Sequence, residues 1–233
     1  MDHEPQPAVP AAQAEPTHVT PKARADARYR QPHRLTALSD GVFAIAMTLL
    51  ALEIKLPEGI SPADLDGFVE SLGDLFSSLG VFVLAFYVTS EYWIGNHRAM
   101  SYVHTVDARA LARTISVLVG VAVLPISMRL IIDWGQFPQA FSITAAVLAT
   151  TSVLAMRLNM HVLKPELADV DPHDRRLLVV QPLVYGVVYA LSIPLAFLLY
   201  FGFGLSAAWA ATFWAVLFVA RPVTKRIVAR SSG

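Results

Sequence analysis

The chain of 233 residues contains no cysteine, and this absence excludes several classes of site. Without thiols there is no disulfide, no thiolate metal site and no cysteine nucleophile. Charged residues are scarce at 15%, and eighteen basic residues balance eighteen acidic ones, so no net positive charge points to nucleic acid as a partner. The seven histidines lack metal-binding spacings such as HExxH. We therefore expect no cofactor and no resident metal.

Long apolar stretches dominate the chain, since 55% of its residues are hydrophobic. This content is too high for an ordinary soluble domain, so a bilayer is the expected solvent. About twenty apolar residues are needed to cross the hydrocarbon as a helix, and six segments approach or reach that length. The predicted spans, which together form a transmembrane domain over 34–228, cover roughly 35–56, 74–97, 107–132, 138–160, 177–200 and 205–228.

The segments outside these spans are short or polar. Residues 1–33 are rich in proline, alanine and charge, and we expect a disordered cytoplasmic tail there. Residues 229–233 are expected to form a short C-terminal tail. The acidic segment 58–74, between the first two spans, is expected to form a short amphipathic helix on the outer surface.

Basic residues are distributed unevenly between the two sides of the predicted domain. An even number of spans puts both termini on one side, and sixteen of the eighteen lysines and arginines fall on that side. Only Lys55 and Arg129 fall on the other. Because cytoplasmic loops carry such an excess of basic residues, we expect a multi-pass protein of the plasma membrane with cytoplasmic N- and C-termini.

The first span carries a polar element, Ser39-Asp40-Gly41, at the start of its apolar core. That core, from Gly41 to Leu52, covers roughly 18 Å and falls short of the hydrocarbon thickness of about 30 Å. Asp40 is therefore drawn to the membrane interface or somewhat inside it, where ionisable groups usually face protein or water. The alternative interpretation is that Ser39 and Asp40 cap a helix that starts there.

The expected partners of Asp40 lie on other helices. Arg34 is six residues away, about 240° around the helix axis, so the two cannot form a simple i,i+4 pair. Trp93 and His97, at the end of the second span, share the predicted depth of Asp40. Three arginines are alternative partners for its charge: Arg98, Arg109 and Arg113.

One face of the first helix is defined by Gly41, Ile45, Thr48 and Leu52, which are spaced by four, three and four residues. Leu49 borders this face. The face either lines a pore or packs against lipid and protein. In the second case the Thr48 hydroxyl would bond back to the carbonyl of Ala44 within the helix.

The run RLTALSDGVFAIAMTLLAL, from Arg34 to Leu52, resembles the first-helix signature of the transmembrane protein 175 family of lysosomal potassium channels and their prokaryotic relatives. The family pattern is Arg, three variable residues and Phe-Ser-Asp. Arg34, Ser39 and Asp40 match it in register, whereas Leu38 replaces the phenylalanine. A Trp followed four residues later by His also occurs in the family, and Trp93 and His97 satisfy that weaker pattern.

The resemblance implies an all-α integral membrane protein with six helices per subunit, assembled as a homotetramer whose four first helices line the pore. It implies an ion pathway along Ile45, Thr48, Leu49 and Leu52, with Ile45 as the narrow apolar constriction. The expected metal is limited to potassium ions that pass through the pore. The remaining matched residues become a structural clamp that holds the pore helix. The clamp residues are Arg34, Ser39, Asp40, Gly41, Trp93 and His97.

The function expected from this resemblance is a channel with a modest preference for potassium over sodium. An apolar ring excludes water when narrow, and the chain has no TVGYG-like stretch to form a carbonyl filter. The alternatives are a proton-conducting channel and a secondary transporter, although internal repeats and broken helices typical of transporters are not evident. We do not expect an enzyme, because no paired carboxylates, nucleophile with base or metal cluster converges at one depth.

Overall fold

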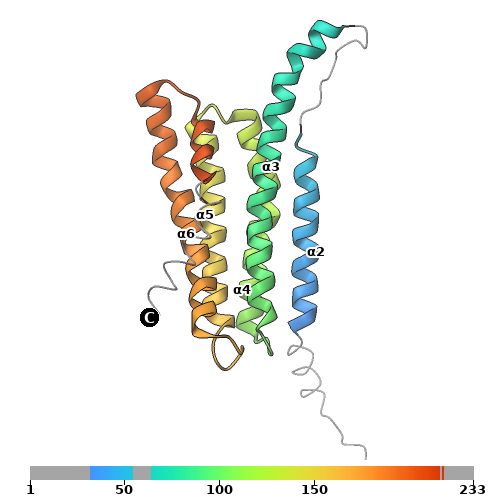
Figure 1. Cartoon of the computed structure of the whole chain (residues 1–233), viewed down its shortest axis with the longest axis vertical. Helices are drawn as coiled ribbons and strands as arrows, with labels where there is room; N and C mark the ends of the chain where they lie inside the picture. The colour runs from blue at the N-terminus through green and yellow to red at the C-terminus, as the bar shows by residue number, and fades with distance from the viewer. Residues whose placement is uncertain (1–31, 55–63, 216, 218–233) are drawn as a thin grey trace, which may run out of the picture.

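The computed structural model describes residues 32–54, 64–215 and 217, and this part of the chain is helical with no strand. Five of its helices are long and apolar enough to cross a membrane, so the expected all-α membrane architecture is confirmed at that level. Successive helices run antiparallel in an upright bundle (Figure 1). Their bounds are α2 Pro32–Ala51, α3 Leu65–Ser101, α4 Ala108–Trp134, α5 Pro138–Val162 and α6 Pro172–Phe197.

The bundle has a central part and two flanks. Helix α2 packs against α3 and α4, whereas α5 packs extensively against both α4 and α6. Helices α2 and α6 therefore lie on opposite flanks (Figure 1). A π-helical turn, η1 at Leu198–Gly202, ends α6, and the 3-10 helix η2 at Ala207–Ala215 packs back onto α6.

Helix α3 differs most from the prediction. It begins at Leu65 rather than near residue 74 and has 37 residues, which gives a length of about 55 Å. Residues Leu65 to Asp74, expected in a separate surface helix, are its first turns, and they project beyond the other helices (Figure 1). Asp64 caps this extension by accepting a 2.9 Å hydrogen bond from the Gly67 N–H. This cap stabilises the first turn of α3, so the helix begins at Leu65 rather than near residue 74.

The ends of the chain are described only in part. Pro32 and His33, assigned to the N-terminal tail, are the first residues of α2, and the rest of that predicted tail lies outside the described residues. The sixth predicted span, 205–228, is described as far as residue 215 and at residue 217. Its remainder and the predicted tail at 229–233 lie outside the described residues as well.

Helices α4, α5 and α6 pack closely because small and hydroxyl side chains lie between them. Gly120 of α4 faces Thr151 of α5 so closely that a Cβ on Gly120 would collide with the Thr151 side chain. The Thr144 hydroxyl donates a 2.6 Å hydrogen bond from α5 to the Ser127 carbonyl of α4. Such contacts let apolar helices associate in a bilayer, where hydrophobic burial between helices contributes little.

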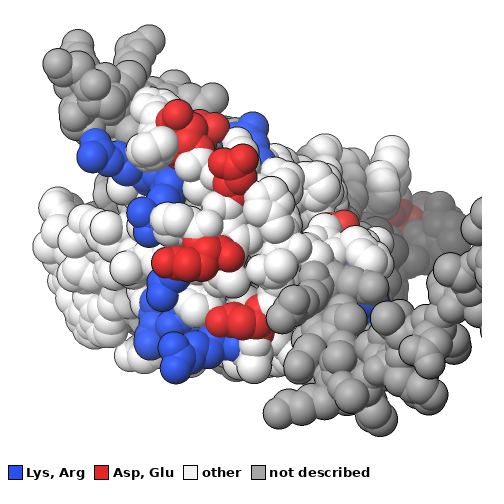
Figure 2. Space-filling view, turned by 90° about the horizontal axis from the view of Figure 1, so that it is seen from below, with Lys and Arg blue, Asp and Glu red and all other residues white. Residues whose placement is uncertain are grey.

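Two loops join at the end of the bundle where α2 begins, which we call the basic end. His104 donates its N–H to the Leu167 carbonyl at 2.9 Å, so the α3–α4 loop is bonded to the α5–α6 loop. The Tyr102 hydroxyl donates to Asp174 at 2.9 Å, which raises the pKa of that phenol because the carboxylate holds its proton. Lysines and arginines form an arc across this end, with acidic residues beside them (Figure 2).

Asp107 connects two helices at the basic end. Its carboxylate caps α4 by accepting a 2.7 Å bond from the Ala110 N–H and lies 3.0 Å from Nε2 of buried His161, in the last turn of α5. Burial acts to raise the pKa of Asp107, but the hydrogen bonds from Ala110 and His161 prevail and hold the pKa below its ordinary value. A lowered folded-state pKa gives stability that is present above the ordinary pKa of 3.8 and lost as pH falls through the folded value.

Replacing Asp107 with Ala should lower the free energy of unfolding by about 2 kcal/mol, because it removes a helix cap and leaves His161 without its carboxylate. Thermal unfolding in detergent at pH 7 measures the loss. Asp64→Ala is the matched control, since Asp64 also caps a helix. An equal loss in the two variants would mean that the contact with His161 contributes nothing.

Candidate functional site

Helix α2 buries one face and leaves the other open. Phe43, Ala46 and Leu50 are at most 3% exposed and form the apolar contact with α3 and α4. The opposite face is exposed along the whole helix, at spacings of three and four residues. Its residues are Arg34, Leu38, Gly41, Ile45, Thr48, Leu49 and Leu52.

All four residues predicted to line the ion pathway lie on this open face. Ile45 is 61% exposed, Leu49 41% and Leu52 77%. The Thr48 hydroxyl donates a 2.9 Å hydrogen bond to the carbonyl of Ile45, one residue away from the Ala44 carbonyl expected under the packing interpretation. Its oxygen therefore keeps lone pairs that can accept a bond or coordinate a cation on the open side.

Asp40 is held by the second long helix, as the shared depth predicted. The Trp93 indole Nε1 of α3 donates a 2.8 Å hydrogen bond to Asp40 Oδ1. Both side chains are half-buried between α2 and α3. The bond to an ionised acceptor is stronger than one between neutral groups and joins the two helices at one depth.

The other predicted clamp residues take different places. Ser39 is fully buried and donates its hydroxyl to the Leu35 carbonyl of its own helix at 3.0 Å, so it neither caps α2 nor bonds α3. The centroid of the exposed His97 ring lies 5.5 Å from that of the Trp93 ring, so His97 contacts Trp93 rather than Asp40. Arg34 is exposed at the start of α2, and Gly41 lies on the open face with free space around its Cα.

The alternative basic partners of Asp40 are not used. Among the described residues, no ion pair joins Asp40 to Arg98, Arg109 or Arg113. The Arg113 guanidinium instead donates to the backbone carbonyl of Arg157 at 2.9 Å. The indole hydrogen bond is therefore the specific contact that the structure gives this carboxylate.

The far end of α2 is also held, by α4. Arg129 lies 3.7 Å from the Glu53 carboxylate and 3.4 Å from that of Asp133. The arginine side chain is 67% exposed, so this pairing is weak compared with a buried one. Between the two ends, Ser90 of α3 contacts the Met47 sulfur at 3.9 Å.

A second polar cluster lies on the side of α3 that faces away from α2, and no pattern in the sequence links its members. Buried Glu91 accepts a 2.8 Å hydrogen bond from the Tyr185 hydroxyl of α6, which in turn lies 2.8 Å from the Gln181 amide. A cavity of about 30 Å³ adjoins them, large enough for a water molecule, and is also lined by Asn96. This cluster ties α3 to α6 and lies apart from the open face of α2.

Known proteins resemble the chain over most of its length. Residues 34–125 match the family model described as Endosomal/lysosomal potassium channel TMEM175. A potassium channel of Streptomyces collinus is 35% identical over 130 residues, which cover 56% of this chain and 61% of the relative. A potassium channel of Chamaesiphon minutus is 32% identical over 169 residues, which cover 68% of this chain and 83% of the relative.

A solved structure resembles the fold as well. It is the crystal structure of a lysosomal potassium-selective channel TMEM175 homolog from Chamaesiphon minutus. The two structures superpose with a TM-score of 0.63 at 27% sequence identity, over 80% of this chain and 97% of that one.

Proposed function

Because the chain belongs to the family of the endosomal/lysosomal potassium channel TMEM175, we propose that it is a subunit of a potassium channel, with its pore formed by the open face of α2. The observation that carries this proposal is the continuous exposed face of α2, which holds Ile45, Thr48, Leu49 and Leu52 on one line. A single helix cannot enclose a pathway, so several copies of the chain are needed. We propose a homotetramer with α2 at its axis.

The chemistry of this face suits a channel that opens by widening. A ring of Ile45 side chains offers no ligand to a hydrated ion and closes the path by excluding water while it is narrow. The Thr48 hydroxyl oxygens, directed to the open side one turn further, provide the nearest ligands for a partly dehydrated cation. A modest preference for potassium follows, because potassium gives up its hydration shell more readily than sodium.

We propose that the chain lies in the plasma membrane with the basic end in the cytoplasm. The support is the sequence distribution of lysine and arginine, since cytoplasmic ends of membrane proteins carry the excess of basic residues. In this orientation Asp40, near the middle of α2, and its partner Trp93 lie on the cytoplasmic side of Ile45, and Glu53 with Arg129 lies just beyond the outer end of the helix.

Purified protein in planar bilayers or liposomes tests the proposal. When an impermeant cation replaces potassium on one side, a tenfold potassium gradient should shift the reversal potential by about 59 mV. Sodium at the same concentration should give smaller currents than potassium. A reversal potential that follows an imposed proton gradient and ignores potassium would overturn the proposal in favour of a proton channel. Potassium uptake that needs a second, co-transported ion would indicate a transporter.

A further inference from the structure

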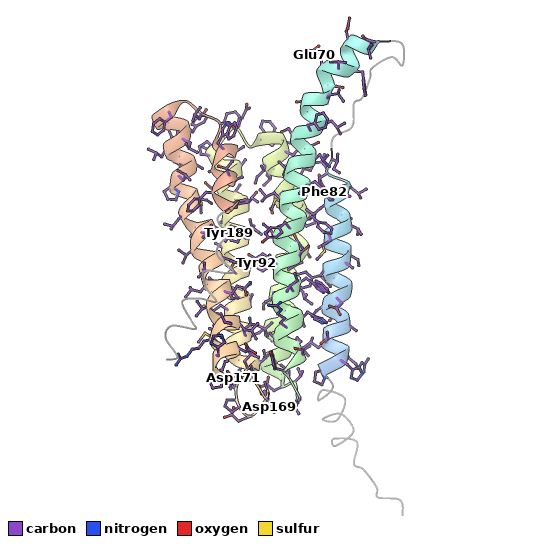
Figure 3. The ribbon with its side chains drawn as sticks, in the orientation of Figure 1. Glu70, Phe82, Tyr92, Asp169, Asp171 and Tyr189 are labelled. Carbon is purple, nitrogen blue, oxygen red and sulfur yellow. The ribbon has the colours of Figure 1, made fainter. Side chains whose placement is uncertain are left out.

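A large groove opens at the basic end, on the flank away from α2. It has a volume of about 710 Å³ and lies between the end of α5, the α5–α6 loop and the start of α6. Figure 3 labels Asp169 and Asp171 in this loop, below the bundle. The groove has an apolar wall that includes Met160, Val179 and Val180, and a polar rim. The polar rim residues are His104, Asp169, Arg175 and Arg176.

The two arginines of the rim carry charges that the described residues do not neutralise. No described acidic side chain forms an ion pair with Arg175 or Arg176. Nearby acids already have other partners, since Asp171 accepts a 2.7 Å bond from the His173 N–H and Asp174 accepts from Tyr102. Two arginines that line one groove and have no ion-pair partner among the described residues are suited to bind phosphate oxygens.

An exposed apolar stripe leads away from this charged rim along α6. Val180, Leu183, Val187 and Leu191 follow Arg176 at spacings of four, three, four and four residues, so all five lie on one face of the helix. Leu183 is 45% exposed, Val187 49% and Leu191 54%. A cationic site at the end of an apolar stripe is complementary to a phospholipid, whose headgroup would lie at the rim and whose acyl chain would lie along α6.

Asp169 adds a requirement for the headgroup. Its exposed carboxylate lines the same groove as the arginines, so a headgroup that carried only negative charge would meet repulsion there. A headgroup with both a phosphate and a primary ammonium can pair with the arginines through its phosphate and with Asp169 through its ammonium. Phosphatidylethanolamine has this chemistry.

We propose that the groove binds one phosphatidylethanolamine, with its phosphate on Arg175 and Arg176, its ammonium on Asp169 and an acyl chain along the Leu183–Val187–Leu191 stripe. The leaflet rests on the proposed function, because placing α2 at the tetramer axis and the basic end in the cytoplasm turns this flank of α6 toward the cytoplasmic leaflet. The size of the groove is within the usual range for small-molecule sites, about 300–1,000 Å³.

Native mass spectrometry of the full-length protein in detergent tests the site without any measurement of current. With matched acyl chains, phosphatidylethanolamine should be retained about tenfold more than phosphatidylglycerol or phosphatidylcholine. Arg175→Gln with Arg176→Gln should reduce that retention about tenfold. Arg157→Gln is the matched control, because Arg157 is an exposed arginine of α5 outside the groove lining, and it should leave retention unchanged.

Asp169→Asn should abolish the preference over phosphatidylglycerol while total phospholipid retention persists, and Glu166→Gln, in the same loop but outside the groove lining, should preserve the preference. This arm keeps the inference testable if the double arginine variant fails to fold. Equal retention of the lipids by the unmodified protein, or a double variant that binds like Arg157→Gln, would overturn the site. A channel that conducts potassium but fails these tests would leave the proposed function standing.

Discussion

Replacing Ile45 with Asn should raise potassium flux through the channel by about tenfold. The proposed pore is narrowest at Ile45, and its closure depends on an apolar surface that water leaves. An amide at this position hydrogen-bonds water, so the constriction stays hydrated at the same backbone width. A tenfold increase corresponds to a barrier lowered by about 1.4 kcal/mol. Single-channel recording, or potassium flux per assembled channel in liposomes, measures the change.

Ile126→Asn is the matched control for this prediction. Ile126 of α4 is the same residue type and is 68% exposed, against 61% for Ile45, but it lies outside the proposed pore face. Its substitution introduces the same amide into the same bilayer and should leave conductance unchanged. A conductance of Ile45→Asn that is unchanged or lower would remove Ile45 from the gate, and an equal rise in both variants would indicate a general loss of integrity.

Breaking the bond between Asp40 and Trp93 should reduce the potassium current per milligram of protein by more than tenfold. Asp40→Ala removes the acceptor and leaves the indole N–H, half-buried between two helices, without its partner. Hydrogen bonds to charged groups contribute about 1.5–3 kcal/mol, and partial exposure puts this one at the lower end. The expected defect is loss of tetramer on size-exclusion chromatography, or intact tetramers with few openings.

Two conservative variants separate this bond from other roles of the same residues. Asp40→Asn keeps an oxygen that accepts from the indole and should retain most of the current, and Trp93→Phe keeps an aromatic ring but removes the donor and should resemble Asp40→Ala. The double variant should be little worse than either single one, because both remove the same bond. Normal tetramers with unchanged currents in Asp40→Ala would disprove the clamp.

Helical periodicity and depth predicted the open face of α2 and a partner of Asp40. The spacing of Gly41, Ile45, Thr48 and Leu52 indicated one face, and these residues all lie on the open side of α2. The depth of Asp40 pointed to Trp93 and His97, of which Trp93 donates a hydrogen bond to Asp40 and His97 contacts Trp93 instead. The family inferred from Arg34 to Leu52 is also confirmed, because the family model and a potassium channel of Chamaesiphon minutus both match the chain.

Other features could not be read from the sequence, for physical reasons. The start of α3 was misplaced because hydropathy marks where a helix enters lipid, whereas Leu65 to Asp74 form helix outside that apolar stretch. The contact of Glu91 with Tyr185 joins positions 94 residues apart, and neither carries a local pattern that identifies the other. The groove on the far flank depends on how two loops meet, which no single segment specifies.

The polar attachments of α2 to its neighbours differ in strength and in their position along the helix. Near the middle of the helix Asp40 accepts the 2.8 Å bond from Trp93, and just beyond its last residue, Ala51, Glu53 makes the longer contact with the exposed Arg129. Sliding along the helix axis would strain both attachments, whereas tilting about Asp40 would strain chiefly the weaker one. We therefore expect a tilt of α2 to pivot near Asp40. For a given tilt, displacement grows with distance from that pivot, so in the proposed pore Ile45, five residues away, would move less than Leu52, twelve residues away.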